Sequence, residues 1–351
     1  MPLKPLTILL TTVGCPGGIT MINALKNNGE RSVKIIGTDM NPYAAGHYFV
    51  DKFYTVPAGK DPGYAVVIEE LAQKESVDII FPQSSTDVMP LSQKRDYFWN
   101  MGIPILIPHT ASAKPCDNKG LMYQTFEGSD IPIPDFRIIS SLEELIGAAH
   151  SLGYPQKTIC FKPTVAKGSR GFRILSANVD KLNELIRKRV EDSTFSLEDC
   201  IRILEKANPF PDLLVSEFLE GREETVDLLC DNGEVLLGFP KTREAIKAGL
   251  AMFFRVLPAD SELMDYARSI VKKLQYDYFI NIQFKGGKLL EINPRVSTFI
   301  HQENYNIPYM GIKWALGEIS RAQLWEYQQQ LRSTRLSVRY YDQVFLDEDT
   351  T

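Results

Sequence analysis

Residues 281–298 decide the fold and read NIQFKGGKLLEINPRVST. Two runs rich in apolar residues, 279–284 and 288–293, flank the glycine pair at 286–287. Because glycine adopts positive φ without a steric penalty, a glycine pair between two such runs predicts a β-hairpin with a tight turn. Pro294 ends the second run, since proline has no N–H for a strand ladder.

Oxygen-bearing side chains are predicted to gather on one face of this hairpin. Side chains alternate along a strand, so Glu291 and Asn293 share a face, and Gln283 on the partner strand can reach it. Mg²⁺ takes one or two carboxylates and completes its shell with phosphate oxygens and water. Arg295 follows the strand, where a guanidinium can clamp a phosphate. On spacing alone, a polar surface hairpin fits equally well.

The set Gln283, Glu291, Asn293 and Arg295, with its E-I-N-P-R-V-S string, resembles the metal-binding hairpin of the ATP-grasp superfamily. The likeness is to the large subunit of carbamoyl-phosphate synthetase and its single-copy relatives. The resemblance implies that the Gln and Glu positions hold Mg²⁺, that the Asn completes the site, and that the Arg contacts the transferred phosphate. It also implies an α/β fold, with an N-terminal Rossmann-like parallel-sheet domain before a two-lobed α+β grasp. We expect a pre-ATP-grasp domain over 1–112, a small lobe over 113–213 and a large lobe over 214–351.

Composition excludes several other classes of protein. The 351-residue chain has a formal net charge of −5, which argues against a nucleic-acid-binding surface. No apolar run approaches the roughly 20 residues of a membrane span. The 5 cysteines are scattered without a C-x-x-C pair, so neither a zinc site nor a disulfide framework is indicated. These features predict a cytoplasmic protein.

The first hundred residues alternate strand and helix patterns, which predicts a parallel, doubly wound sheet. The predicted strands are 6–11, 33–39, 77–81 and 103–107, and the predicted helices are 19–28 and 64–74. A glycine turn at 14–18 with Asp39 further along mimics a dinucleotide fingerprint, so an NAD-dependent dehydrogenase is one alternative. The string is G-x-x-G-G with a proline inside it, which departs from that fingerprint. Residues 82–87 are either a substrate loop or a capped helix start.

A phosphate-binding half is expected in the middle of the chain. Lys119 follows Asp117 and Asn118, a departure from the D-K pair of the resembled helix, whose lysine reaches the α-phosphate. Lys162 ends a predicted strand, 158–163. The following glycine-rich segment can cradle phosphate oxygens with backbone amides, and it resembles the loop that covers the β- and γ-phosphates. Its candidate cofactor-binding residues are Lys167, Gly168, Ser169 and Gly171. Solvated lysines and a plain surface turn are the alternatives.

The segment 213–221 resembles the hinge strand between the two lobes. There, the resemblance implies, the backbone of Phe218 and Leu219 reads the adenine edge, and the Glu217 carbonyl accepts from the exocyclic amine. Glu223 would then accept from the ribose hydroxyls. Strand alternation would turn Glu224 away and place Thr225 and Asp227 on the face of Glu223.

The remaining expectations concern Arg243 and three segments. Arg243 follows the predicted strand 233–239 and could hold an acyl phosphate or a carboxylate, although a solvated charge fits as well. Residues 191–211 carry an amphipathic piece that we interpret as a surface helix. A helix is predicted over 312–331 and a last strand over 337–341.

The resemblance implies an ATP- and Mg²⁺-dependent ligase, with Mn²⁺ as a possible substitute. ATP would phosphorylate a carboxylate, and an amine would displace the phosphate and leave an amide, ADP and phosphate. Arg295, Lys162 and Arg243 would carry the catalysis through charge and position. Small-molecule acids and amines are the expected partners, and a homodimer is possible. Phosphorylation of bicarbonate or carbamate, and an ATP-binding regulatory protein without turnover, are the alternatives.

Overall fold

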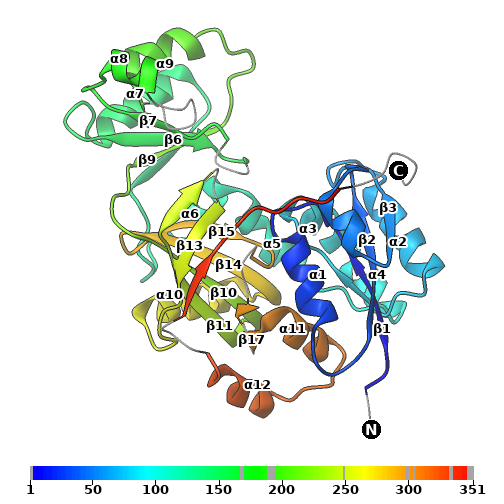
Figure 1. Ribbon diagram of the computed structural model, residues 1–351. Helices are drawn as coiled ribbons and strands as arrows, with labels where there is room; N and C mark the ends of the chain where they lie inside the picture. The colour runs from blue at the N-terminus through cyan, green and yellow to red at the C-terminus, as the bar shows by residue number, and fades with distance from the viewer. Residues whose placement is uncertain are drawn as a thin grey trace.

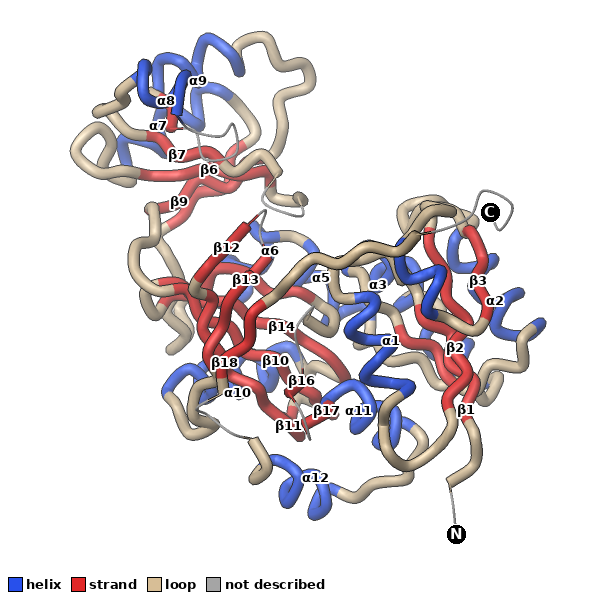
Figure 2. Tube along the Cα trace, viewed as in Figure 1, coloured by secondary structure: helices blue, strands red, loops and turns tan. Residues whose placement is uncertain are grey.

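The computed structural model describes residues 3–166, 170–187, 194–247, 250–297, 301–302, 305–331 and 335–345. An N-terminal domain packs beside a larger C-terminal part, and a smaller lobe projects from that part (Figure 1). Figure 2 shows that this small lobe, with β6, β7 and β9, stands apart from the other two parts. No helix among the described residues is long and apolar enough to cross a membrane.

The N-terminal domain is built on a parallel sheet with both faces covered, as predicted. The strand order is β3-β2-β1-β4. Ile8 and Leu10 pack on α1, while Leu9 between them packs in the cluster that contains α2 and α3. This alternation makes β1 apolar on both sides, which is typical of parallel sheets. The elements of this part of the chain are β1 Leu6–Leu10, α1 Gly18–Lys26, β2 Val33–Asp39, η1 Ala45–Phe49, β3 Lys52–Thr55, α2 Tyr64–Lys74, β4 Ile79–Phe81, α3 Ser85–Ser92, α4 Arg95–Asn100, α5 Thr110–Asp117 and α6 Lys119–Phe126.

Two predictions for this domain were wrong. Residues 103–107 do not form a strand but make a single parallel bridge, Ile80 to Ile105. Pro104 supplies a carbonyl to Ile80 and has no N–H to extend the ladder. The fourth strand is instead β3, whose side chains are exposed or half-buried, so no apolar run marked it.

The small lobe is a five-stranded sheet in the order β5-β9-β6-β7-β8. Its elements are β5 Phe136–Ile139, α7 Leu142–Ser151, β6 Ile159–Pro163, β7 Arg173–Leu175, α8 Lys181–Arg187, β8 Thr194–Phe195, α9 Leu197–Leu204 and β9 Leu213–Glu217. The amphipathic helix predicted within 191–211 is α9. Leu197 and Cys200 are buried in the core of the lobe with α7. The apolar face of α9 is therefore part of the lobe's own core.

The large lobe holds an antiparallel sheet in the order β11-β10-β14-β15. One face of β10 and β14, with residues such as Val226 and Ile282, packs against α10. The odd-numbered residues on the other side are polar along the middle of the sheet, and Leu229 and Phe279 at its end join the N-terminal core. The elements are β10 Glu223–Asp231, β11 Glu234–Arg243, β12 Ala245–Lys247, β13 Leu250–Arg255, α10 Glu262–Leu274, β14 Tyr278–Lys285, β15 Lys288–Asn293, β16 His301–Gln302, β17 Tyr305–Asn306, α11 Ile307–Ala315, α12 Arg321–Gln328 and β18 Leu336–Val338.

The helix predicted over 312–331 is two helices, α11 and α12. Gly317 adopts φ of +69° after α11, a conformation that suits glycine and ends a helix. Ser320 then starts α12 with a capping box, because its side chain accepts from the Gln323 N–H while the Gln323 side chain accepts from Ser320 N–H. Apolar spacing alone did not reveal this break. The predicted last strand is shorter, since β18 spans only Leu336–Val338.

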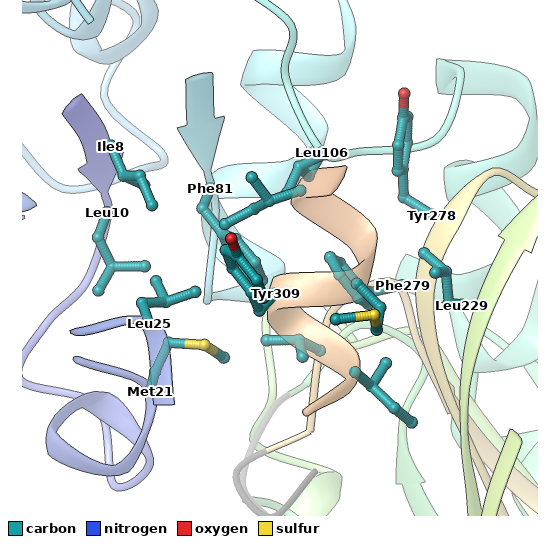
Figure 3. Packing of buried hydrophobic residues seen from close by; sticks show 14 of the residues in the cluster. Ile8, Leu10, Met21, Leu25, Phe81, Leu106, Leu229, Tyr278, Phe279 and Tyr309 are labelled. Carbon is teal, nitrogen blue, oxygen red and sulfur yellow. The ribbon is translucent and has the colours of Figure 1, made fainter. Parts of the chain in front are cut away.

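Helix α11 joins the N-terminal domain to the large lobe. Tyr309 of α11 packs among residues of both parts, including Leu25, Phe81 and Phe279 (Figure 3). The Arg31 side chain is buried against this helix, where Nε donates to Tyr309 Oη at 3.0 Å. The two parts share one hydrophobic core, which fixes the ends of the N-terminal strands beside the large-lobe sheet.

The close contact of α11 with β14 gives a stability prediction. A Cβ added at Gly311 would lie 2.3 Å from Phe279 Cζ, inside a filled core. Gly311→Ala is expected to lower the free energy of unfolding by about 1–3 kcal/mol, the usual cost of overpacking. Gly147→Ala is the matched control, since a Cβ there meets nothing within 4 Å in helix α7, and alanine should be neutral or stabilising. Urea unfolding of the two variants measures the difference, and equal midpoints would contradict the packing argument.

We propose three structural units with boundaries that differ slightly from those expected. The 112/113 boundary falls inside α5, so we place it before Thr110. The 213/214 boundary falls inside β9, which is hydrogen-bonded to β5 and β6 of the small lobe, so we place it after Glu217.

Candidate active site

The predicted hairpin is present as β14 and β15. Gly286 and Gly287 form the turn with φ of +55° and +80°, the positive values that a two-residue hairpin turn needs. Gln283 lies directly across from Glu291, and Asn281 lies across from Asn293. The predicted ligand residues Gln283, Glu291 and Asn293 therefore share one face of the sheet.

The donor set on this face fits Mg²⁺. It offers one carboxylate, Glu291, with amide oxygens from Gln283 and Asn293, which are the hard ligands that Mg²⁺ takes. Among the described residues, no group of three or more His, Cys, Asp or Glu side chains could hold a metal alone. Mg²⁺ usually completes its shell with water and substrate phosphate oxygens, so one carboxylate with two amides is a compatible protein contribution.

The predicted phosphate-binding lysines converge on Glu291. Lys119 Nζ lies 3.0 Å from Glu291 Oε1 and donates to the Ala166 carbonyl at 2.6 Å. Burial lowers the pKa of the Lys162 ammonium, while Glu291 opposes that shift and Lys119 adds to it. Burial alone would raise the pKa of the Glu291 carboxyl, but Lys119 and Lys162 lower it overall. The site therefore holds two cations against one carboxylate, an arrangement that suits a polyanionic ligand with a divalent cation.

The glycine-rich segment lies at the end of β6. Gly171 has φ of +75°, and a Cβ there would lie 2.6 Å from Pro163 Cδ, so the turn requires glycine. Lys119 N–H donates to the Thr164 carbonyl, which ties the start of α6 to this segment. The other candidates from the segment, Lys167, Gly168 and Ser169, lie outside the described residues.

The predicted hinge residues lie at the end of β9, whose last residue is Glu217. The Glu217 carboxylate forms an ion pair with Lys288 of β15, so the predicted hinge and the β14–β15 hairpin are in contact. The Glu217 carbonyl accepts from the Ser216 hydroxyl at 3.2 Å. Lys285 Nζ lies 5.5 Å from the centre of the Phe218 ring. Leu219 follows Phe218 in the same segment, and the adenine role of these residues stays a prediction.

Glu223, Arg243 and Lys285 line a cavity of about 380 Å³. Arg243 Nη1 and Lys285 Nζ each lie 3.4 Å from a Glu223 carboxylate oxygen. Arg243 Nη1 also donates to Gln283 Oε1. Arg243 is therefore brought to the metal hairpin, but it lies inside β11 and not after a strand as predicted. Lys285 was missed, although its place across from Glu223 follows from the strand register.

Arg295 connects the hairpin with the N-terminal domain. Its Nη1 donates to the Val296 carbonyl at 2.8 Å. Burial lowers the pKa of its guanidinium, and the nearby Cys15 thiol and Glu291 carboxylate oppose that shift. Cys15 belongs to the glycine turn after β1, so this turn lies near enough to Arg295 for the two groups to interact electrostatically. Sequence reasoning gave Cys15 no role, because only the tertiary fold brings it there.

Two carboxylates at the carboxyl ends of the N-terminal strands, Asp39 and Asp87, accept hydrogen bonds from within the domain. The Asp39 carboxylate accepts from Gly14 N–H at 2.8 Å and Asn41 N–H at 2.9 Å, so it stabilises its own turn. Ser84 caps α3 by accepting from the Thr86 N–H, which matches the capped-helix interpretation of residues 82–87. Asp87 is buried, and the Thr11 hydroxyl donates to it at 2.6 Å. Both carboxylates therefore stabilise the loops at this edge of the sheet.

Two family models match separate parts of the chain. Residues 8–106 match the "PylC-like, N-terminal domain", and residues 209–339 match "ATP-grasp in the biosynthetic pathway with Ter operon". A carbamoyl phosphate synthase large chain from Lachnoclostridium phytofermentans is 29% identical over 238 residues. That match covers 62% of this chain and 20% of the relative, so the chain spans about a fifth of the relative's length.

Solved structures of similar fold cover most of the chain. N5-carboxyaminoimidazole synthetase from Staphylococcus aureus, complexed with ADP, has a TM-score of 0.66 at 15% identity over 91% of this chain and 79% of that one. Phosphoribosylglycinamide synthetase from Anaerococcus prevotii has a TM-score of 0.61 at 18% identity over 95% and 80%. The biotin carboxylase domain dimer of Hydrogenobacter thermophilus 2-oxoglutarate carboxylase, with MgADP and bicarbonate, has a TM-score of 0.65 at 17% identity over 91% and 71%. The chain is therefore similar to ATP-grasp proteins over residues 209–339 and to PylC-like N-terminal domains over residues 8–106, and it shares the overall fold of these solved structures.

Proposed function

We propose that this protein is an ADP-forming ligase that activates a carboxylate as an acyl phosphate and transfers the acyl group to an amine. The observation that carries the proposal is the convergence of Lys119 and Lys162 on Glu291 in the metal hairpin. Cations next to a single carboxylate suit the charges of a metal-bound triphosphate. Arg295 lies on the same hairpin beside the N-terminal domain.

ATP and Mg²⁺ are the proposed cofactors, with Mn²⁺ as a possible substitute. Similar structures hold ADP or MgADP, which supports the assignment. We place adenine at Glu217–Leu219, ribose at Glu223, and the phosphates at Lys119, Lys162 and the glycine-rich segment. Gln283, Glu291 and Asn293 would hold the metal, which neutralises phosphate charge when bound.

The proposed reaction has two steps. A carboxylate oxygen of the substrate attacks the γ-phosphorus, the bond to the β-phosphate oxygen breaks, and ADP leaves. The amine nitrogen then attacks the acyl carbon, the carbon–oxygen bond breaks, and phosphate leaves with that oxygen while the amine proton passes to solvent. Lys162, Arg243 and Arg295 bind and orient the phosphoryl group, and their positive charges stabilise the charge that spreads over its oxygens.

A second candidate function is phosphorylation of bicarbonate or carbamate. The similarity to a carbamoyl phosphate synthase large chain favours it, as does the bicarbonate named with one structure of similar fold. The same site residues would act, and only the acid would differ. Small-molecule acids and amines are the proposed partners in either case, and a homodimer stays a prediction.

Phosphate release measured over a panel of carboxylic acids, bicarbonate and amines tests the proposal. We expect release that requires ATP, Mg²⁺ and one acid–amine pair. With that acid labelled by ¹⁸O in its carboxylate, one label should appear in the released phosphate. AMP and pyrophosphate as products, or phosphate without label, would contradict the acyl-phosphate step.

A further inference from the structure

The side-chain amide of Asn281 lies between the metal hairpin and a buried polar network. Asn281 is 3% exposed and belongs to β14, two residues before Gln283 and across from Asn293. Its Oδ1 accepts from Gln283 Nε2 at 3.1 Å and from Asn293 Nδ2 at 3.3 Å. On the other side, its Nδ2 donates to Thr225 Oγ1 at 2.6 Å and to Asp227 Oδ1 at 2.7 Å.

Hydrogen-bond partners on β10 fix the orientation of the Asn281 side-chain amide. The Asp227 carboxylate also accepts from Lys241 Nζ, and Lys241 is only 1% exposed, so this charged pair lies in the core. A carboxylate paired with an ammonium accepts hydrogen bonds and does not donate them. The Thr225 hydroxyl gives its hydrogen to the Ile282 carbonyl at 3.0 Å, so toward Asn281 it is an acceptor too. Both neighbours require a donor, which turns Nδ2 of Asn281 to them and Oδ1 to the hairpin.

The fixed Oδ1 in turn orients the two amides of the metal hairpin. Only an N–H can donate to Oδ1, so Gln283 and Asn293 turn their nitrogens toward Asn281 and their oxygens away from it. Gln283 Oε1 accordingly meets a donor, Arg243 Nη1. A hard cation is coordinated by amide oxygens, and an amide nitrogen in the same place is not a ligand for it. We propose that Asn281 is a positioning residue that presents the amide oxygens of Gln283 and Asn293 to the divalent cation of the nucleotide site.

This role rests on the proposed function, since it concerns the metal of that site. It predicts that loss of Asn281 lets each hairpin amide rotate, so that nitrogen replaces oxygen for part of the time. Removal of such an outer partner usually weakens metal binding by about 10–100-fold. Nucleotide contacts of Lys119 and Glu223 do not pass through Asn281, so nucleotide affinity in the absence of metal should be unchanged.

The experiment measures Mn²⁺ binding to the full-length protein saturated with a nonhydrolysable ATP analogue, with free Mn²⁺ followed by electron paramagnetic resonance. Asn281→Leu keeps the branched shape of the side chain and removes its acceptor, and we expect about 10–100-fold weaker Mn²⁺ binding. Asn281→Ala is the second variant, in case leucine overpacks the site. Thermal unfolding of each variant without ligand measures the loss of stability separately.

Two further variants separate positioning from a general structural effect. Thr225→Val removes a hydrogen bond from the same buried network but leaves Asp227, which accepts from Asn281 Nδ2 at 2.7 Å and alone keeps the amide in its orientation. This variant should therefore lower stability and leave Mn²⁺ affinity nearly unchanged. In an Asn293→Asp background, the loss caused by Asn281→Leu should shrink, because a carboxylate presents an oxygen in either rotation.

The outcomes distinguish the inference from the proposed function. If the unaltered protein with analogue binds no Mn²⁺, the proposed nucleotide site itself is wrong. If it binds Mn²⁺ and the Asn281 variants bind it equally well, the positioning role is wrong. An equal loss from Asn281→Leu with and without the Asn293→Asp substitution, or a matching loss in Thr225→Val, would also overturn that role.

Discussion

Glu291→Gln is expected to lower ATP-dependent turnover by about 10²–10⁴-fold, since a metal contributes several kcal/mol of charge stabilisation to phosphoryl transfer. Glu291 is the carboxylate of the metal hairpin, and Lys119 lies 3.0 Å from it. The substitution keeps the size of the side chain and removes its negative charge. Steady-state rates over a series of Mg²⁺ concentrations measure the loss, and the apparent affinity for Mg²⁺ should fall with the rate.

Glu224→Gln is the matched control for this substitution. Glu224 lies on β10 across from Phe284, on the face opposite to Glu223, and its partner is Arg222 at 3.8 Å. The same chemical change at Glu224 should leave turnover near its original value. Both variants should fold, since partly exposed side chains outside the core contribute little to stability. Full Mg²⁺-dependent turnover in Glu291→Gln would remove Glu291 from the site.

Arg295→Ala is expected to lower kcat by about 10²–10³-fold, the usual cost of removing one group that stabilises transition-state charge. Nucleotide affinity should change much less, because the triphosphate keeps Lys119, Lys162 and the glycine-rich segment. An arginine that acts mainly on charge developing during transfer affects kcat more than binding. Comparing kcat with the dissociation constant of ADP separates the two effects.

Arg268→Ala provides the control for lost positive charge. Arg268 lies on α10 and pairs with Asp265 on the surface, away from the hairpin face. It should change neither kcat nor ADP binding. If Arg295→Ala instead weakens ADP binding as strongly as it lowers kcat, then Arg295 binds the ground state and has no special part in transfer.

The β14–β15 hairpin could be predicted from sequence because its signals are local. A glycine pair sets the turn and a period of two sets the face, so the shared face of Gln283, Glu291 and Asn293 follows from spacing, whereas their metal role came from the resemblance and stays a prediction. The parallel sheet of the first domain was also predictable, since its strands are apolar on both faces. Elements with weaker local signals, such as β3, were missed.

Contacts between distant segments could not be predicted in the same way. The ion pairs Lys119–Glu291 and Lys288–Glu217 join parts of the chain that only the tertiary fold brings together. The burial of Lys241 beside Asp227 could not be predicted either, because a lysine in a polar stretch of sequence usually indicates a solvent-exposed charge. The role of Asn281 depends on that buried pair, so it could be inferred only from the structure.

A crystal structure of the protein with Mn²⁺ and a nonhydrolysable ATP analogue, with anomalous scattering recorded from manganese, tests the central claim most directly. We predict a manganese peak at the oxygens of Glu291 and the hairpin amides, with the triphosphate beside Lys119 and Lys162. Adenine should lie at the segment that follows β9. Nucleotide bound instead at the ends of the N-terminal strands near Asp39, or manganese away from Glu291, would contradict the account.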